Sequence, residues 1–214
     1  MDIKKHIEHT VLKADTSKND VLRICKEAIE HNFFGVCVPP YFVKTAKEAL
    51  KESNISVVTV VGFPLGYSST PSKVEEVKRA LDEGADEIDM VINIAALKEQ
   101  DFAYVSNDIS SLATLIHIKG KKIKVIIETA LLTQEEKLKA LEICIASNVD
   151  FVKTSTGFSH SGAQVDDIEL MRKKLPAKIK IKASGGIKTK EQAIALINAG
   201  ADRIGASSSV DFVA

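Results

Sequence analysis

Residues 179–186 read IKIKASGG, a short alternating apolar run that ends in two glycines. Such a run is typical of a β-strand followed by a tight turn, because strand side chains alternate between two faces. Seven such runs, separated by longer stretches of helical spacing, cover Gly35 to Val38, Val57 to Gly62, Glu87 to Asn93, Ile123 to Glu128, Phe151 to Thr154, Ile179 to Ala183 and Arg203 to Ala206. A weaker eighth run lies near Ile7 to Thr10. This alternation predicts parallel strands joined by helices.

The stretches between the strands carry the signals that begin and end helices. Capping boxes are predicted at Thr133 to Glu136 and at Thr189 to Gln192, and an N-cap at Thr70 before a first-turn proline. A weak internal repeat occurs at three places where a predicted helix ends and the next strand begins. Its copies are Gly84 to Asp86, Asn148 to Asp150 and Gly200 to Asp202. The glycines suit the left-handed position just past a helix end.

No linker or shift in charge interrupts the series, so we expect a single catalytic domain over residues 1–214 that folds as an α/β (β/α)8 TIM barrel. Eight residues follow Ala206, too few for a normal barrel helix, so the final helix should be short or missing. We then expect a neighbouring subunit, as in a homodimer, or the first helix to cover the last strand. The alternative is a doubly wound open sheet, but its GxGxxG fingerprint is absent.

Composition excludes several classes of partner. Lys plus Arg and Asp plus Glu number 29 each, so the chain has no overall basic field for nucleic acid or an anionic membrane. No apolar stretch is long enough to cross a bilayer, and the N-terminal residues lack a secretory signal. The three cysteines form no CxxC pair. These features predict a reduced, cytoplasmic protein.

Strand parity places an unusual number of charges inside the barrel. If the isoleucines of residues 178–182 pack under helices, the lysines of that run face inward. The same parity turns Asp89 and Lys153 inward, and together with Lys182 they lie near the carboxyl ends of their strands, where barrel enzymes have active sites. Two close, buried lysines push one another toward the neutral, nucleophilic amine. The alternative for this triad is an internal salt bridge; Lys124, Glu87, Lys178 and Lys180 are interpreted as a structural network or a solvated barrel bottom.

Glycine-rich loops follow the strands that carry these lysines. Gly185 and Gly186 come after Lys182, and Gly205 with Ser207 and Ser208 closes the last strand. The loops after strands seven and eight commonly hold a phosphate in barrels. Thr156 and Gly157 supply a possible third arm. The alternative is that the glycines only make tight turns. Cys37 matches the inward parity and is kept as a possible substrate contact without a chemical step.

Several segments resemble the deoxyribose-phosphate aldolases. Residues 151–158 (FVKTSTGF) resemble that family's Schiff-base segment, and residues 181–186 (IKASGG) its second-lysine and phosphate segment. Further likenesses cover residues 84–93, 125–129 and 205–208, so that the resemblance runs from about Ile7 to Ser208. It implies a (β/α)8 barrel that cleaves 2-deoxy-D-ribose 5-phosphate, a small phosphorylated sugar, to acetaldehyde and D-glyceraldehyde 3-phosphate without a metal or an organic cofactor.

The resemblance also implies roles for individual residues. Lys153 matches the Schiff-base lysine, Lys182 the lysine that tunes it, and Asp89 the carboxylate that relays protons. Glu8 stands where that family usually has aspartate, and Pro39 where asparagine is common. Two other functions stay open: another Schiff-base lyase or transferase for phosphosugars, such as a transaldolase-like barrel, and a phosphosugar-binding barrel without chemistry. The retained pair of lysines argues against the second.

Overall fold

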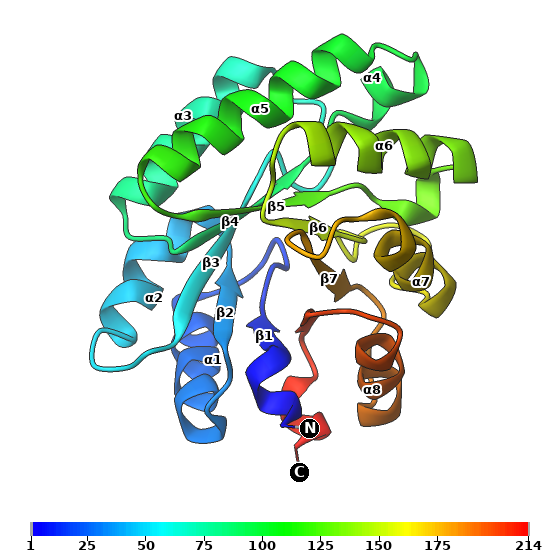
Figure 1. Ribbon diagram of the computed structural model, residues 1–214. Coiled ribbons are helices and arrows are strands. Elements are labelled where there is room, and N and C mark those ends of the chain that lie inside the picture. The colour runs from blue at the N-terminus through cyan, green and yellow to red at the C-terminus, as the bar shows by residue number, and fades with distance from the viewer. Residues whose placement is uncertain (1, 214) are drawn as a thin grey trace.

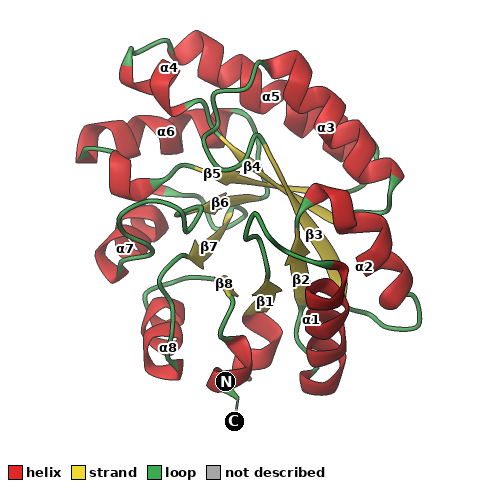
Figure 2. Cartoon of the chain, turned by 180° about the vertical axis from the view of Figure 1, so that it is seen from behind, coloured by secondary structure: helices red, strands yellow, loops and turns green. Residues whose placement is uncertain are grey.

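The computed structural model describes residues 2–213, and its eight parallel strands close into a barrel in which each strand pairs with the next and β8 pairs with β1. The strands are β1 (Ile7–Thr10), β2 (Gly35–Val38), β3 (Ser56–Val61), β4 (Glu87–Val91), β5 (Lys122–Ile126), β6 (Phe151–Lys153), β7 (Lys180–Ser184) and β8 (Arg203–Ala206). The helices surround them (Figures 1 and 2). The predicted TIM barrel is confirmed.

Eight α-helices and four short 3-10 helices connect the strands within the described residues. The α-helices are α1 (Lys18–His31), α2 (Val43–Ala49), α3 (Thr70–Asp82), α4 (Ile94–Lys98), α5 (Phe102–Ile118), α6 (Gln134–Ala146), α7 (Val165–Lys174) and α8 (Lys190–Asn198). The 3-10 helices are η1 (Ile3–His6), η2 (Pro40–Phe42), η3 (Thr129–Leu131) and η4 (Ser209–Phe212). Both predicted capping boxes are present. The N-cap of α3 is Ser69 and not Thr70, because the Ser69 side chain accepts the Ser72 amide.

The main apolar core lies between the strands and the ring of helices, because alternate strand residues point outward. Ile181 and Ala183 of β7, for example, are fully buried in this layer. Inside the barrel, Cys37, Val58 and Val60 form a separate small apolar cluster. The remaining interior is largely polar, since Asp89, Lys124 and other charged side chains are also buried there.

The repeat found in the sequence forms a repeated clamp between strands. Each of its three aspartates lies just before a strand, and its carboxylate accepts a backbone N–H from the preceding strand. The bonds are Val57 N to Asp86 Oδ2 at 3.1 Å, Ile123 N to Asp150 Oδ2 at 2.9 Å and Ile181 N to Asp202 Oδ2 at 2.9 Å. These charge-assisted bonds satisfy amides at the barrel bottom and help to fix the register of neighbouring strands.

The final helix is short, as predicted, and the chain itself covers the last strand. Between β8 and Val213 the chain forms only η4, which contacts β1 and α8. Phe212 of η4 is fully buried, and Ile3 of η1 joins the same core. The two 3-10 helices lie beside each other between α1 and α8 (Figures 1 and 2). The cover at this end of the barrel therefore comes from α8, which contacts β8, and from η4. The first helix, α1, contacts α2, β1 and β2 instead.

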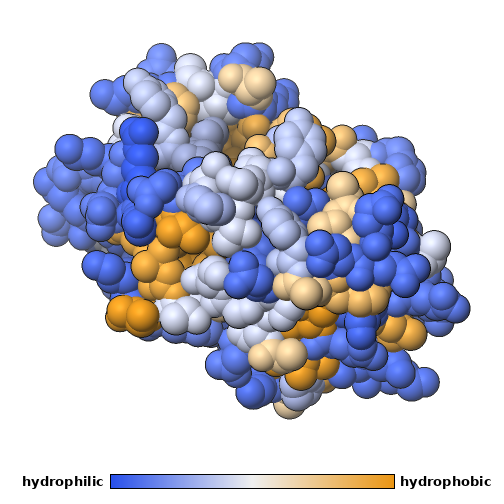
Figure 3. All heavy atoms as spheres, turned by 90° about the horizontal axis from the view of Figure 1, so that it is seen from above, coloured by the Kyte–Doolittle hydropathy of each residue, from blue (hydrophilic) through white to orange (hydrophobic). Residues whose placement is uncertain are grey.

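The surface is mixed. On the face drawn in Figure 3, hydrophilic residues dominate and apolar residues form separate patches. Among residues 2–213, no helix is both long and apolar enough to span a bilayer.

A buried ion pair joins α3 to α5 behind β4. Lys73 and Asp108 are both fully buried, and Lys73 Nζ lies 2.5 Å from Asp108 Oδ2. Lys73 Nζ also donates to the carbonyl oxygen of Val91 at 2.9 Å, and Thr70 Oγ1 donates to Asp108 at 2.9 Å. The side chain of Lys73 therefore links two helices to the carboxyl end of a strand.

Removing one partner of this pair should destabilise the barrel strongly. We expect Asp108→Ala to lower the free energy of unfolding by about 3–5 kcal/mol, because it leaves a buried ammonium group without its counter-ion. The double variant Lys73→Met, Asp108→Leu should recover most of that loss. Urea unfolding monitored by circular dichroism measures both values. Equal losses in the single and double variants would show that packing, and not the unpaired charge, sets the cost.

Candidate active site

Lys153, Lys182 and Asp89 come together inside the barrel, as parity predicts. Lys153 is the last residue of β6 and is the register partner of Lys182 on β7. The Nζ atoms of Lys153 and Lys182 lie 2.8 Å and 2.7 Å from the same atom, Asp89 Oδ2. All three side chains are almost completely buried. A single carboxylate oxygen on β4 thus bridges two amines on neighbouring strands.

The surrounding network contains one more basic group than acidic groups. Four buried basic side chains, Lys124, Lys153, Lys182 and Arg203, face three buried carboxylates, Glu8, Glu87 and Asp89. Unbalanced charge in a protein interior is costly, so one basic group is favoured in its neutral form. Lys153 forms an ion pair with one carboxylate only, whereas each of the other three contacts two or more. The network therefore favours Lys153 as the neutral amine.

The pKa shifts agree with this argument from contacts. Burial lowers the pKa of Lys153 below the usual value of 10.5, and the charge of Lys182 lowers it further against the opposing effect of Asp89. Burial also opposes the charged form of Lys182, but the carboxylates of Asp89 and Glu8 outweigh it and raise that pKa. The pKa of Asp89 is well below its ordinary value because Lys124, Lys153 and Lys182 together overcome the effect of burial. The two lysines are thus shifted in opposite directions.

Glu8 and Arg203 support this pair from below. Glu8 Oε2 accepts from Lys182 Nζ, and its other oxygen accepts from Arg203 Nη1 at 3.0 Å. Arg203 also lies over the ring of Phe34, 3.2 Å from its centroid. The carboxylate of Glu8, which replaces an aspartate of the resembled family, is therefore part of the charged network and anchors Lys182.

Of the charged residues predicted near the amino ends of the strands, only some point into the barrel. Lys124 and Glu87 are buried and paired at 2.6 Å, so the structural network expected for them is present. Lys178 is exposed and donates to Asn148 Oδ1 at 2.9 Å, because β7 begins only at Lys180. Lys180 lies near Phe151 but is exposed to water at the open bottom of the barrel. The prediction that Lys178 points inward is wrong.

The glycine loops surround a hollow above Lys153. It has a volume of about 600 Å³, and eight of the predicted site residues line it: Lys153, Thr156, Gly157, Gly185, Gly186, Gly205, Ser207 and Ser208. Gly157, Gly185 and Gly186 have φ angles of 88°, 85° and 71°, which L side chains rarely adopt. Glycine is therefore needed in these loops for the backbone path itself. Lys13 and Lys188 also line the hollow.

Asp89, Lys182 and Cys37 are not part of this lining, because they lie in the barrel interior. Cys37 is fully buried beside Val58 and Val60, and burial raises the pKa of its thiol to about 11. A thiol with a raised pKa is a poor nucleophile, which agrees with assigning Cys37 no chemical step.

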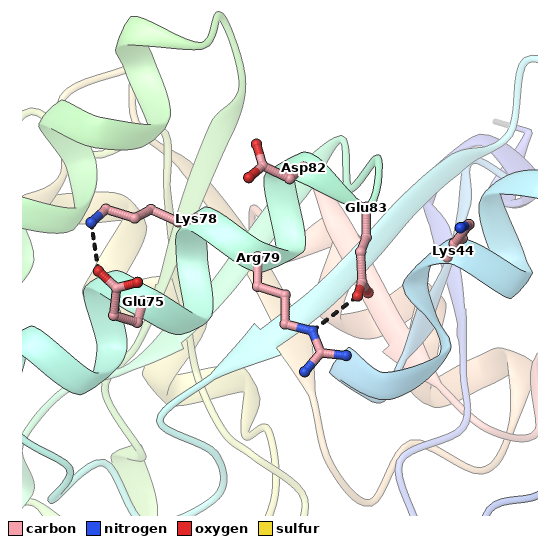
Figure 4. Close-up of a pocket in the computed structure, with 6 residues that line it drawn as sticks. All are labelled: Lys44, Glu75, Lys78, Arg79, Asp82 and Glu83. Carbon is pink, nitrogen blue, oxygen red and sulfur yellow. Dashed lines mark hydrogen bonds and ion pairs between the residues drawn. The ribbon is translucent and has the colours of Figure 1, made fainter.

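A second hollow of similar size lies on the outside of the barrel and has a different character. It is lined by Lys44 of α2 and, along α3 and its C-cap, by Glu75, Lys78, Arg79, Asp82 and Glu83 (Figure 4). Glu75 pairs with Lys78, and Glu83 pairs with Arg79. These exposed groups neutralise one another, so this groove lacks the convergent chemistry of the barrel mouth. Within residues 2–213, no group of three or more His, Cys, Asp or Glu side chains is arranged to hold a metal ion.

Three residues of the site were not singled out from the sequence. Ser184 Oγ donates to the Ser155 carbonyl at 2.6 Å and so joins the loops after β6 and β7. Arg203 shares the inward parity of Gly205 on β8, which is the signal that could have identified it. Glu128 ends the predicted strand that starts at Ile123, but its contact with Thr156 through both the amide and the hydroxyl depends on a turn that periodicity does not reveal.

The comparisons with known proteins match this geometry. The sequence profile of the DeoC/LacD family aldolases matches residues 4–210. A deoxyribose-phosphate aldolase of Thermococcus gammatolerans is 54% identical over 215 residues, which cover 100% of this chain and 96% of that protein. One of Finegoldia magna is 53% identical, with 100% and 99% covered. A solved tetrameric deoxyribose phosphate aldolase from Aeropyrum pernix has a TM-score of 0.92 at 27% identity, covering 99% of this chain and 89% of that one. The chain therefore belongs to the DeoC/LacD family of aldolases.

Proposed function

We propose that this protein catalyses the reversible cleavage of 2-deoxy-D-ribose 5-phosphate to acetaldehyde and D-glyceraldehyde 3-phosphate through a Schiff base on Lys153. The observation that carries the proposal is a lysine with a lowered pKa at the floor of a hollow ringed by glycine loops. The names of the relatives support this choice of substrate over other phosphosugars.

The geometry supports a role for each group. The neutral amine of Lys153 attacks the aldehyde carbon to give a carbinolamine, which takes up a proton and loses water to form a protonated imine. The imine withdraws the electron pair of the bond between carbons 2 and 3 while the hydroxyl on carbon 3 loses its proton. Asp89, which contacts both lysines, can move protons between water and the reacting atoms, and Lys182 keeps positive charge beside the imine. Protonation of the enamine at carbon 2 and hydrolysis then release acetaldehyde and regenerate Lys153.

The phosphate is assigned to the other end of the hollow. Gly185, Gly186, Gly205, Ser207 and Ser208 would hold it through loop amides and hydroxyl groups, with Thr156 and Gly157 as a third arm. Cys37 is not part of the lining of the hollow and stays only a possible substrate contact.

We further propose a cytoplasmic enzyme that forms a homo-oligomer, such as a dimer, and takes no cofactor. Three buried, free cysteines suit a reducing compartment. The relative from Aeropyrum pernix is described as a tetramer. Several large apolar side chains, including Tyr41 and Tyr67, are more than half exposed and are available for contacts between subunits.

Borohydride reduction tests the covalent step. With acetaldehyde present, reduction should inactivate the protein irreversibly and leave an ethyl group on the peptide that contains Lys153. Lys153→Ala should abolish both labelling and turnover. Peptide mass spectrometry locates the label, and Lys137→Ala, a change in a lysine outside the barrel interior, is the control. A label on Lys182, or full turnover without Lys153, would contradict the assigned role.

The pH dependence of turnover tests the role of Lys182. The reactive amine of Lys153 becomes available as the pH rises through its lowered pKa. Lys182→Leu removes a positive charge beside Lys153 and leaves Asp89 with one lysine fewer to pair with, and both changes raise the pKa of Lys153. We expect lower activity at neutral pH and a limb of the kcat/KM profile that moves to higher pH. An unchanged profile would show that Lys182 does not tune Lys153.

A substitution in the glycine loops tests the phosphate assignment. Gly186→Asp places a carboxylate and a side chain at a φ of 71°, so we expect KM for deoxyribose 5-phosphate to rise at least about tenfold, or ~1.4 kcal/mol. Turnover of deoxyribose, which lacks the phosphate, should change much less. Equal effects on the two substrates would place the phosphate elsewhere.

A further inference from the structure

Glu128 combines three unfavourable features at one position next to the hollow. Its φ of 55° is left-handed, and it is the only buried non-glycine residue with a positive φ among residues 2–213. Of the buried carboxyl residues in the same range, it is also the only one without an ion pair. Its Oε1 atom is buried and has no hydrogen-bond partner. Strain and burial of this kind gather where a structure serves function.

The contacts of Glu128 lead directly to the wall of the hollow. Thr156 donates to Glu128 Oε2 through its backbone N–H at 3.1 Å and through its hydroxyl at 2.5 Å. The hydroxyl of Thr156 in turn accepts the N–H of Phe158 at 3.1 Å. One carboxylate oxygen thus fixes the turn Thr156–Gly157–Phe158, whose three residues line the hollow.

The backbone of Glu128 is itself held against β6. The amides on its two sides bond to that part of the chain, from Ile127 N to Lys153 O at 3.0 Å and from Thr129 N to Thr154 O at 2.9 Å. The residues just after Lys153 are tied on the other side, because Ser184 bonds to both Thr154 and Ser155. Thr156 is the first residue of this arm beyond those bonds, and Glu128 supplies its side-chain partner.

We propose that Glu128 is a positioning residue that fixes the Thr156–Gly157–Phe158 arm, and thereby aligns the phosphorylated substrate with Lys153. This rests on the proposed function for the identity of the substrate, but the placement of the arm is independent of it. Thr156 uses its N–H and its hydroxyl hydrogen on Glu128, so its contribution to the hollow is the shape of the arm and not a free donor.

Two variants of matched length separate hydrogen bonding from packing. Glu128→Gln keeps an oxygen that can accept from Thr156, whereas Glu128→Met fills similar space without such an acceptor. Hydrogen exchange of the peptide spanning residues 154–160 reads the arm without any need for activity. We expect protection to be kept in the Gln variant and lost locally in the Met variant. Equal protection in both variants would overturn the proposal, whatever the enzyme acts on.

Kinetics then distinguish positioning from loss of the fold. In the Met variant, kcat/KM for deoxyribose 5-phosphate should fall on the order of 10²-fold, as for a misplaced substrate, while the Gln variant stays within roughly threefold of the wild type. Trapping of acetaldehyde on Lys153 should persist in both, because the small aldehyde does not span the arm. Loss of trapping in the Met variant, or an equal loss of kcat/KM in the Gln variant, would contradict positioning through Thr156. A wild type that traps no acetaldehyde would instead contradict the proposed function, and the exchange result would still decide the role of Glu128.

Discussion

The carboxylate of Asp89 is shared by three lysines, and the rest of the site depends on how that shared charge is balanced. Desolvation makes an excess charge expensive inside the barrel, so the network with four basic groups and three carboxylates favours one neutral amine. The contacts select Lys153, because Lys124, Lys182 and Arg203 each have more than one carboxylate beside them. Lys153 is therefore favoured as the nucleophile because it has fewer carboxylate partners than the other basic groups, as well as because it is buried.

The barrel provides the low-dielectric setting that gives these charges their effect. Outward-facing strand residues such as Ile181 bury themselves under helices, which leaves the alternate positions to fill the interior. One part of that interior is apolar, around Cys37 and Val58, and another part is ionic. The ionic part lies beneath the loops after β6, β7 and β8, so the reactive amine opens toward a single hollow. The Asp clamps at strand starts help to hold the register on which this arrangement depends.

The mouth of the barrel follows a different physical rule from its interior. Its loops need backbone angles that glycine adopts freely, as at Gly157 and Gly185. These two glycines also lie close together, because a Cβ atom added to Gly185 would lie only 3.3 Å from the Cα atom of Gly157. Such loops have little side-chain packing of their own. Hydrogen bonds from buried polar groups, including Ser184 and Glu128, give them a defined path.

The sequence by itself determined the alternation of strands and helices, both capping boxes, the short end after β8 and the inward direction of Asp89, Lys153 and Lys182. These features follow from local periodicity, which a chain carries before it folds. The parity prediction failed at Lys178 because the start of β7 is set by its pairing with β6. The N-cap of α3 lies one residue before the predicted Thr70 because the Ser69 side chain accepts the Ser72 amide. Only the closed barrel decided the contacts of Glu8 with Lys182 and Arg203, since β1 and β8 are far apart in the chain and meet only on closure. Periodicity turned both lysines inward and the family resemblance assigned Lys153 the Schiff base. The physical reason for that choice is the charge balance of the assembled interior, which only the tertiary structure decided.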